Sequence, residues 1–196
     1  MSNQTLGNRE AWLQQAITAL RPIFTESGYD VPECHASCGF ASSGVRSGHI
    51  GQCWPTKSCT SGINQIFICP TLEDPVAVLD TLVHELVHAV DNCEHGHGKE
   101  FKKIATKIGL VGRMRSATAG PELRVRLKDI ADSLGPYPHS ALQKPCRTVR
   151  LYERPKAVCS ECGFTVPMLK AFLHFGPPIC PKDKIEMDPE GYWDVT

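Results

Sequence analysis

The stretch HELVHAVDNCEHGHGKEF, residues 84–101, holds four of the eight histidines in the chain. Residues four positions apart on a helix lie one turn apart on the same face, so His84 and His88 project side by side. Two imidazoles at this spacing can bind one zinc ion. Glu85, at the edge of the pair, is placed to take a proton from an attacking water. This H-E-x-x-H arrangement predicts a catalytic zinc site.

The residues around this motif predict that it lies on a helix. Residues 73–92 begin with Asp74 in the N-cap position and Pro75 in the first helical position, which is how helices commonly start. The apolar residues of this segment fall on the side away from the two histidines and are expected to face the core. They are Leu79, Leu82, Leu86 and Val90.

A catalytic zinc ion needs a third protein ligand and leaves its fourth position open. The metzincin pattern would require glycine at position 91 and histidine at position 94. This chain has Asp91 and Glu94 there, so the metzincin class is excluded. A glutamate ligand would have to be Glu122, at the start of a later helix. The two histidines of the loop after the motif, His95 and His97, are the other candidates.

This segment resembles the SprT-like (Spartan-type) metalloproteases, whose signature is H-E-x-x-H, a variable loop, and then H-G-x-x-F or H-G-x-x-W. His97, Gly98 and Phe101 match the second half, whereas no aromatic residue stands at the matching place after His95. The resemblance therefore implies that His97 is the third ligand. The residues agree with it: Gly98 permits a sharp turn into the next helix and Phe101 packs into the core, whereas His95 lies mid-loop without such an anchor.

The resemblance extends over most of the chain from about residue 40. It includes segments similar to SprT-like proteins often carried by bacteriophages, namely IGQCW, NQIFICP, TAGPEL and LGPYPHSAL. It implies a zincin-type metalloprotease fold, with Glu85 as general base and substrates that are proteins on, or crosslinked to, DNA. A DNA-binding or transcription-associated adaptor with a structural or vestigial zinc site is the alternative. The intact Glu85 argues against it, because a structural site has no use for a base.

The rest of the chain predicts an α+β fold in two parts. An amphipathic first helix is expected to bury Trp12, Ala16, Leu20 and Ile23. Glycine-rich turns separate expected strands, and two further helices follow the motif. The strands are expected within 33–44, 48–54 and 64–70, and the helices within 98–110 and 120–135. The proline-rich segment 135–145 is the expected linker, which gives a metalloprotease domain over 1–140 and a small β-rich module over 145–196.

The C-terminal module carries the spacing of a zinc ribbon, C-x-x-C followed by a second pair. The second pair lacks its last cysteine, and a carboxylate stands in its place. The predicted ligands are Cys159, Cys162, Cys180 and Asp183. His174 and Cys146 are alternatives for the fourth position. SprT-like proteins commonly end in such a module, so the resemblance implies a second, structural zinc ion.

Other polar residues and thiols have less specific surroundings. Tyr137 and His139 could stabilise an oxyanion, as tyrosine and histidine do in other zinc hydrolases, but a structured proline-rich turn is the favoured interpretation. Six further cysteines form no C-x-x-C pair and are expected to be buried thiols. They are Cys34, Cys38, Cys53, Cys59, Cys69 and Cys93.

Charge is unevenly distributed although the net charge is zero. Residues 1–98 hold four Lys/Arg and ten Asp/Glu, whereas residues 99–184 hold seventeen and seven. A basic second half predicts an anionic partner, and non-specific DNA fits that requirement. The basic residues around the predicted ribbon are Arg147, Arg150, Arg154, Lys156 and Lys170.

The expected compartment is the cytoplasm, or the host cytoplasm if a phage encodes the chain. The sequence has no apolar run long enough to span a bilayer, so no membrane association is expected. The N-terminal residues lack the basic and apolar blocks of a secretory signal. In a reducing compartment the ten cysteines are expected to be thiols and metal ligands rather than disulfides.

Overall fold

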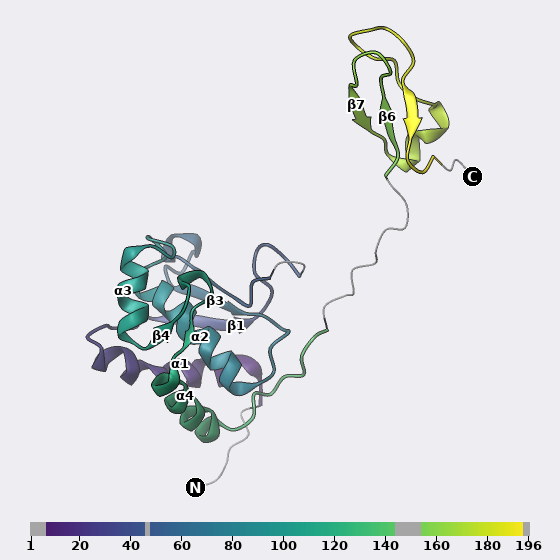
Figure 1. The fold of residues 1–196 in the computed structure, drawn as a ribbon. Coiled ribbons are helices and arrows are strands. Elements are labelled where there is room, and N and C mark those ends of the chain that lie inside the picture. The colour runs from purple at the N-terminus through teal and green to yellow at the C-terminus, as the bar shows by residue number, and fades with distance from the viewer. Residues whose placement is uncertain (1–6, 46–47, 144–153, 194–196) are drawn as a thin grey trace. The chain divides into compact units, whose positions relative to one another are not determined.

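The computed structural model describes residues 7–45, 48–143 and 154–193. The chain divides into two compact units, an N-terminal unit, Met1–Lys144, and a C-terminal unit, Pro145–Thr196 (Figure 1). Both contain short strands, and the helices longer than two turns are in the N-terminal unit. The predicted α+β class is confirmed. None of the helices in the described residues combines the length and apolar character needed to cross a membrane.

The N-terminal unit contains the helices and strands expected from periodicity, together with a short hairpin that was not expected. In chain order its elements are α1 (Arg9–Glu26), β1 (Cys34–Cys38), β2 (Gly51–Trp54), η1 (Thr56–Ser58), β3 (Asn64–Ile68), α2 (Pro75–Val90), α3 (Lys99–Lys107), β4 (Leu110–Val111), η2 (Met114–Ser116), β5 (Thr118–Ala119) and α4 (Pro121–Leu134). The unexpected hairpin is β4–β5. Its strands are only two residues long, too short for an alternating pattern to show in the sequence.

A three-stranded sheet in the order β1-β3-β2 supports the helices of this unit. Strand β3 runs parallel to β1 and antiparallel to β2. Alternate residues of β1 and β3, among them Ala36, Ile66 and Ile68, are buried against the helices. Helix α1 packs on β1, α2 packs on β2 and β3, and α4 packs on both helices (Figure 1).

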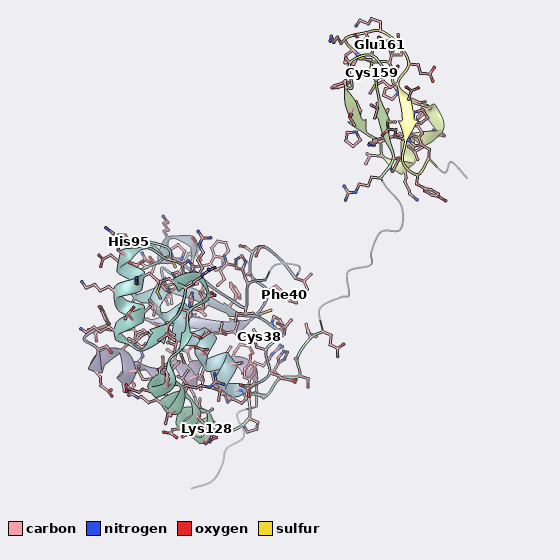
Figure 2. The ribbon with its side chains drawn as sticks, in the orientation of Figure 1. Cys38, Phe40, His95, Lys128, Cys159 and Glu161 are labelled. Atoms are coloured by element: carbon pink, nitrogen blue, oxygen red, sulfur yellow. The ribbon has the colours of Figure 1, made fainter. Side chains whose placement is uncertain are left out.

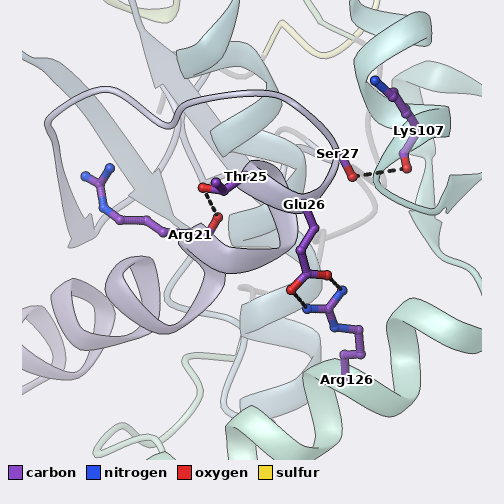
Figure 3. A network of polar contacts seen from close by, with 6 residues as sticks. All are labelled: Arg21, Thr25, Glu26, Ser27, Lys107 and Arg126. Atoms are coloured by element: carbon purple, nitrogen blue, oxygen red, sulfur yellow. Dashed lines mark hydrogen bonds and ion pairs between the residues drawn. The ribbon is translucent and has the colours of Figure 1, made fainter.

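Polar contacts join the C-terminal end of α1 to two other helices (Figure 3). Glu26 accepts two hydrogen bonds from the Arg126 guanidinium of α4, at 2.8 and 3.0 Å. Ser27 Oγ donates to the backbone carbonyl of Lys107 at the end of α3, at 3.3 Å. The four predicted stripe residues of α1, from Trp12 to Ile23, are buried. Exposed ion pairs contribute only about 0.2–1 kcal/mol, so α1 is held mainly by its apolar stripe.

Helix α2 begins and ends with clear capping features. The Asp74 carboxylate accepts a hydrogen bond from the backbone N–H of Ala77 at 2.8 Å, which confirms the predicted N-cap. The first three predicted core positions of α2 are fully buried, and the fourth, Val90, is partly buried. After the helix, Asn92 and Cys93 adopt positive φ angles of 47° and 59°, which turn the chain back toward the helix surface.

The C-terminal unit is a three-stranded antiparallel sheet in the order β7-β6-β8. Its elements are β6 (Lys156–Val158), β7 (Thr165–Pro167), η3 (Lys170–Phe175) and β8 (Asp188–Glu190). Its cluster of buried residues consists of Ala157, Cys159, Cys180 and Met187. A core of this size is too small to stabilise a fold alone, so the unit needs a further source of stability.

Candidate metal centres

Within the described residues, two groups of side chains could hold a metal ion. The first consists of His84 and His88, from successive turns of α2, and His97, from the loop before α3. His97 Nε2 lies 3.1 Å from His84 Nε2 and 3.2 Å from His88 Nε2. Three rings that direct the same nitrogen at one point leave space there for a cation.

Phe101 supports the three rings from α3. Its side chain is fully buried, as expected from the sequence. Its ring centroid lies 5.0 Å from that of His84, 4.4 Å from that of His88 and 4.9 Å from that of His97. Since one rigid ring contacts all three imidazoles, the loop histidine is fixed relative to the two helical ones.

His95 and Glu122 lie outside this group. His95 is exposed near the start of α3 (Figure 2). Contrary to expectation, it does have an anchor: its Nδ1 lies 2.7 Å from Asp91 Oδ1, and its backbone N–H donates to Asp91 Oδ2 at 2.9 Å. The Asp91 carboxylate thereby ties down the loop that carries His97. Glu122 lies in the first turn of α4 and does not line the pocket around the histidines.

Glu85 lies under the histidine group, where α2 comes very close to β2. Its side chain is buried, with 6% of the residue surface exposed. A Cβ atom at Gly51 would lie 2.5 Å from Glu85 Oε1 and 2.7 Å from Thr81 Cγ2, so only glycine fits at this position of β2. Burial raises the pKa of Glu85 to about 8, and the backbone N–H of Cys53 offsets part of the rise. A carboxyl group in this range can both accept and release a proton near neutral pH.

Burial has the opposite effect on the two helical histidines. Together with the neighbouring imidazoles, it lowers the pKa of His84 to about 4 and the pKa of His88 to about 3. Both rings are therefore neutral at pH 7, which is the form that binds a metal ion. The backbone carbonyl of Ala117 next to His84 acts in the other direction and raises its pKa. Partners of this kind fix the orientation of a metal-binding imidazole.

The β4–β5 hairpin supplies that carbonyl and is itself fastened to α2. The backbone N–H of Ala119 donates to Asp80 Oδ1 at 2.7 Å, one helical turn before His84. The hairpin thus contacts α2 both at Asp80 and at His84. It forms one wall of the pocket over the histidines, while residues 41–43 and 48–53 form another.

Sequence reasoning missed two basic residues that line this pocket, His49 and Arg115. The pKa of His97 is lowered by burial first, and then by the nearby charges of Arg115 and His49. Both basic residues lie in short connecting segments with no regular spacing, so no sequence signal pointed to them.

Tyr137 and His139 do not line the pocket. The Tyr137 ring packs against Trp12 of α1, with centroids 5.0 Å apart. His139 Nε2 lies 2.8 Å from the carbonyl oxygen of Pro70, and its Nδ1 lies 3.3 Å from Arg9 Nη1. These contacts match the favoured interpretation, a structured turn, rather than a role at the histidine group.

The six unpaired cysteines are less buried than expected. Cys34 and Cys69 are buried, whereas the other four are partly exposed, because they lie on the edge strands β1 and β2 or in connecting segments. Cys53 and Cys93 line the pocket, and Cys93 Sγ lies 3.5 Å from the Cys53 carbonyl oxygen. None of the six belongs to a group that could hold a metal within the described residues.

The second group lies in the C-terminal unit and consists of Cys159, Cys162, Cys180 and Asp183. Asp183 Oδ2 lies 3.2 Å from Cys159 Sγ and 3.5 Å from Cys180 Sγ. The sulfur atoms of Cys162 and Cys180 lie 3.7 Å apart. Hydrogen bonds from the thiols of Cys162 and Cys159 lower the pKa of Asp183, which keeps it an anion among the sulfur atoms.

The two halves of this group have the same backbone pattern. In the first, the N–H of Cys159 donates to the carbonyl of Phe164 at 2.9 Å and the N–H of Gly163 donates back to Cys159 at 2.9 Å. In the second half, the N–H of Cys180 donates to the carbonyl of Ile185 at 2.7 Å, and the N–H of Lys184 donates back to the carbonyl of Cys180 at 3.0 Å. Gly163 and Lys184 also share a positive φ, 70° and 62°.

This repeat puts Asp183 in the place that Cys162 has in the first half, three residues after the leading cysteine. It favours Asp183 over the two alternatives for the fourth position. His174 stacks on Phe175, with ring centroids 4.0 Å apart, and is not part of the group. Cys146 lies outside the described residues.

No protein-family model, curated protein or solved structure matches the chain.

Two separate ligand groups lead us to expect two metal ions per chain when the protein is purified without chelator. Elemental analysis should show that Cys162→Ser removes one ion and leaves the other, whereas Asp183→Cys should keep both. Since the C-terminal unit has a small core, removing its metal should unfold that unit alone, seen by NMR as loss of its dispersed amide signals. A wild-type content near one ion per chain would contradict the second centre.

Because the Glu85 carboxyl is buried, we expect the unfolding free energy of the metal-free protein to depend on pH. Its pKa is 4.5 when unfolded and about 8 when folded, so between these values the folded state binds more protons and its stability falls as pH rises. Glu85→Gln removes this loss. The difference in unfolding free energy between variant and wild type should therefore grow with pH, by at most about 1.4 kcal/mol per pH unit.

Urea denaturation of chelator-treated protein, followed by helical circular dichroism, measures this difference. His84 and His88 also make the unfolding free energy depend on pH, but their contributions are the same in both proteins and cancel in the difference. Glu100→Gln, at an exposed position of α3, is the matched control and should give a constant difference across the same pH range. Parallel curves for Glu85→Gln and wild type would show that the carboxyl is not buried as described.

Proposed function

We propose that the chain is a zinc-dependent metalloprotease of the SprT-like kind, with a zincin-type domain followed by a zinc ribbon. One observation carries the proposal: three imidazole nitrogens converge in a pocket that a buried glutamate also lines. A purely structural site gains nothing from a buried carboxylate that does not bind the metal. The H-E-x-x-H and H-G-x-x-F residues described above supply this arrangement.

The distances within both groups fit zinc. Ligand nitrogens about 2.0–2.1 Å from a tetrahedral zinc ion are ~3.4 Å apart, and sulfur atoms at about 2.3 Å are ~3.8 Å apart. The observed separations are 3.1 and 3.2 Å between the imidazole nitrogens and 3.7 Å between two sulfur atoms. Three protein ligands in the first group leave a position for water, whereas four in the second close the site. The first group therefore suits catalysis and the second suits a structural ion.

Glu85 is the general base in this proposal. When bound, zinc would polarise the scissile carbonyl and lower the pKa of a water ligand to about 7. Glu85 accepts a proton from the attacking water and then delivers it to the leaving amine, which breaks the peptide bond. Burial against Gly51 holds the carboxylate in one place for both transfers. His84, His88 and His97 hold the metal.

DNA-associated proteins are the substrate class we propose, because the C-terminal unit has features of a nucleic-acid surface. Large aromatic side chains are exposed on it, among them Phe172, Phe175 and Tyr192, with 52%, 77% and 36% of their surface exposed. Lys170 Nζ lies 5.4 Å from the Tyr192 ring centroid. Exposed aromatic rings among basic residues can stack on bases while the cations contact phosphates. Binding without sequence preference would hold the protease near proteins on DNA.

The competing function is a DNA-binding or transcription-associated adaptor in which the histidine group is structural or vestigial. Such a protein would not need an accessible pocket over the metal. The pocket that contains the histidines and Glu85 therefore favours the protease. We place its action in the cytoplasm, or the host cytoplasm if a phage encodes it. Every cysteine of the described residues is free, as expected in a reducing compartment.

Glu85→Gln should separate base from ligand. It should keep the metal but reduce peptide hydrolysis by about 100- to 10,000-fold, because only the proton acceptor is lost. His97→Ala should lose the metal of the N-terminal unit, whereas His95→Ala, the matched loop control, should keep most of the metal and activity. Elemental analysis and a fluorogenic peptide assay measure both effects. Loss of the metal in His95→Ala would show that the third ligand is misassigned.

DNA binding should depend steeply on salt, because phosphate contacts release counterions. Lys156 is not a suitable position for testing phosphate contacts, because its Nζ lies 2.7 Å from Glu190 Oε2 and its charge is already paired. Reversing the charges of Arg154, Lys170 and Lys182 should lower the log–log salt slope by about 3 and remove any stimulation of proteolysis by DNA. Hydrolysis of a small free peptide should be unchanged.

The control reverses charge on the N-terminal unit at Lys128, which is exposed on α4 (Figure 2) and should leave the salt slope unaltered. Fluorescence anisotropy with a labelled oligonucleotide between low and moderate salt measures the slope. Wild-type protein that has no DNA affinity at low salt would remove the DNA part of the proposal and leave the protease part standing.

A further inference from the structure

Residues 41–43 and 48–50, which precede β2, form one wall of the pocket over the histidine group and are hydrogen-bonded to the sheet. The backbone N–H of Ser42 donates to Gln52 Oε1 at 2.6 Å, and Gln52 Nε2 donates to Ser42 Oγ at 3.0 Å. The backbone N–H of Cys69 donates to the Ile50 carbonyl at 2.9 Å, at the end of β3. His49 lies between these two attachment points, directly before Ile50.

The His49 ring is held by a side chain of the same wall. Its Nδ1 lies 2.9 Å from Ser43 Oγ. When the serine hydroxyl donates to Nδ1, the proton of the neutral imidazole is on Nε2. This nitrogen has no hydrogen-bond partner in the described part of the chain. The ring is thus oriented through one nitrogen, and in this tautomer it has a donor at the other.

His49 lines the same pocket as His84, Glu85, His88 and His97. It is close enough to His97 for its charge to act on that ring. It is not one of the three histidines whose nitrogens converge, so it remains available to a bound substrate.

We propose that His49 is a further catalytic residue, which donates a hydrogen bond from Nε2 to the oxygen of the scissile carbonyl as negative charge develops there. This inference rests on the proposed peptide hydrolysis at the histidine group. The donor forms no covalent bond and transfers no proton; it lowers the energy of the tetrahedral transition state relative to the planar substrate. The sequence had assigned this task, as one alternative, to Tyr137 or His139, and neither lines the pocket.

Arg115 is the rival donor, because it is a cation of the same pocket. Arg115, on η2, and His49 are both exposed, but Arg115 has no hydrogen bond or ion pair in the described residues, whereas His49 has its contact with Ser43. A group that must be immobilised during the reaction stabilises the transition state less than one already held in place. The Ser43 contact gives His49 that advantage.

The test compares kinetic constants of the zinc-loaded, full-length protein on one fluorogenic peptide. His49→Ala should lower kcat about 100-fold, with KM and zinc content within about twofold of wild type. His49→Gln, which keeps an N–H donor, should recover part of the loss, and Ser43→Ala should lose less than His49→Ala. His35→Ala is the matched control, since His35 is an exposed residue of β1 outside the pocket and should leave kcat unchanged.

A binding measurement provides a readout besides turnover. A peptide phosphonamidate carries the tetrahedral oxyanion, whereas the intact peptide does not. His49→Ala should weaken binding of the phosphonamidate by about the factor lost in kcat. In a Glu85→Gln background, where the peptide is not cleaved, His49→Ala should leave the affinity for the intact peptide unchanged.

The outcomes separate this inference from the proposed function. If wild type cleaves peptide, Glu85→Gln does not, and His49→Ala keeps wild-type kcat, the protease stands and the role of His49 is refuted. The role of His49 is also refuted, and the protease stands, if Arg115→Ala lowers kcat and His49→Ala does not. If wild type cleaves no peptide, the proposed function and the role of His49 both fall.

Discussion

Helix α2 lies so close to strand β2 that only glycine fits between them, and the chemistry of the N-terminal unit depends on that contact. A side chain at Gly51 would overlap Glu85 and Thr81. Because β2 covers this face of the helix, Glu85 is shielded from water although it borders a pocket, and its pKa rises to about 8. The same approach puts the pocket wall over the two helical turns that carry His84 and His88. One backbone contact therefore sets both the protonation of Glu85 and its position beside the candidate ligands.

The elements that fix this contact were predictable from local sequence. Asp74 and Pro75 start α2, and the spacing of Leu79, Leu82 and Leu86 sets which side faces the core, so the register of His84, Glu85 and His88 follows. Strand β3 alternates clearly over Asn64–Ile68. The C-x-x-C spacing likewise indicated the ligand group of the C-terminal unit. In each case the information lies within a few residues of the feature itself, which is why periodicity and capping rules could recover it.

The parts that could not be predicted depend on contacts between distant segments. The β4–β5 hairpin brings the Ala117 carbonyl to His84, yet each of its strands is two residues long. In the sequence Asp91 stands out only as a departure from the metzincin pattern, but in the structure its carboxylate fixes the loop through His95. His49 reaches the pocket only because Gln52 and Cys69 fasten the segment around it. Nothing in the spacing of these residues marks them, since each role exists only once the sheet and α2 have assembled.

The two candidate centres stand in opposite relations to the fold. The histidine group is built on α2, whose core side is packed with fully buried leucines and valines, and Phe101 fixes the third ring. That scaffold holds the site in place before any ion arrives, as a centre that must keep an open position requires. In the C-terminal unit, two of the four main buried residues, Cys159 and Cys180, are themselves members of the ligand group. There the candidate ligands form part of the core, so the free energy of binding a metal ion would contribute directly to the stability of the folded unit. The repeated turn that aligns Asp183 with Cys162 suits this role, because it provides a fourth donor with little apolar packing around it.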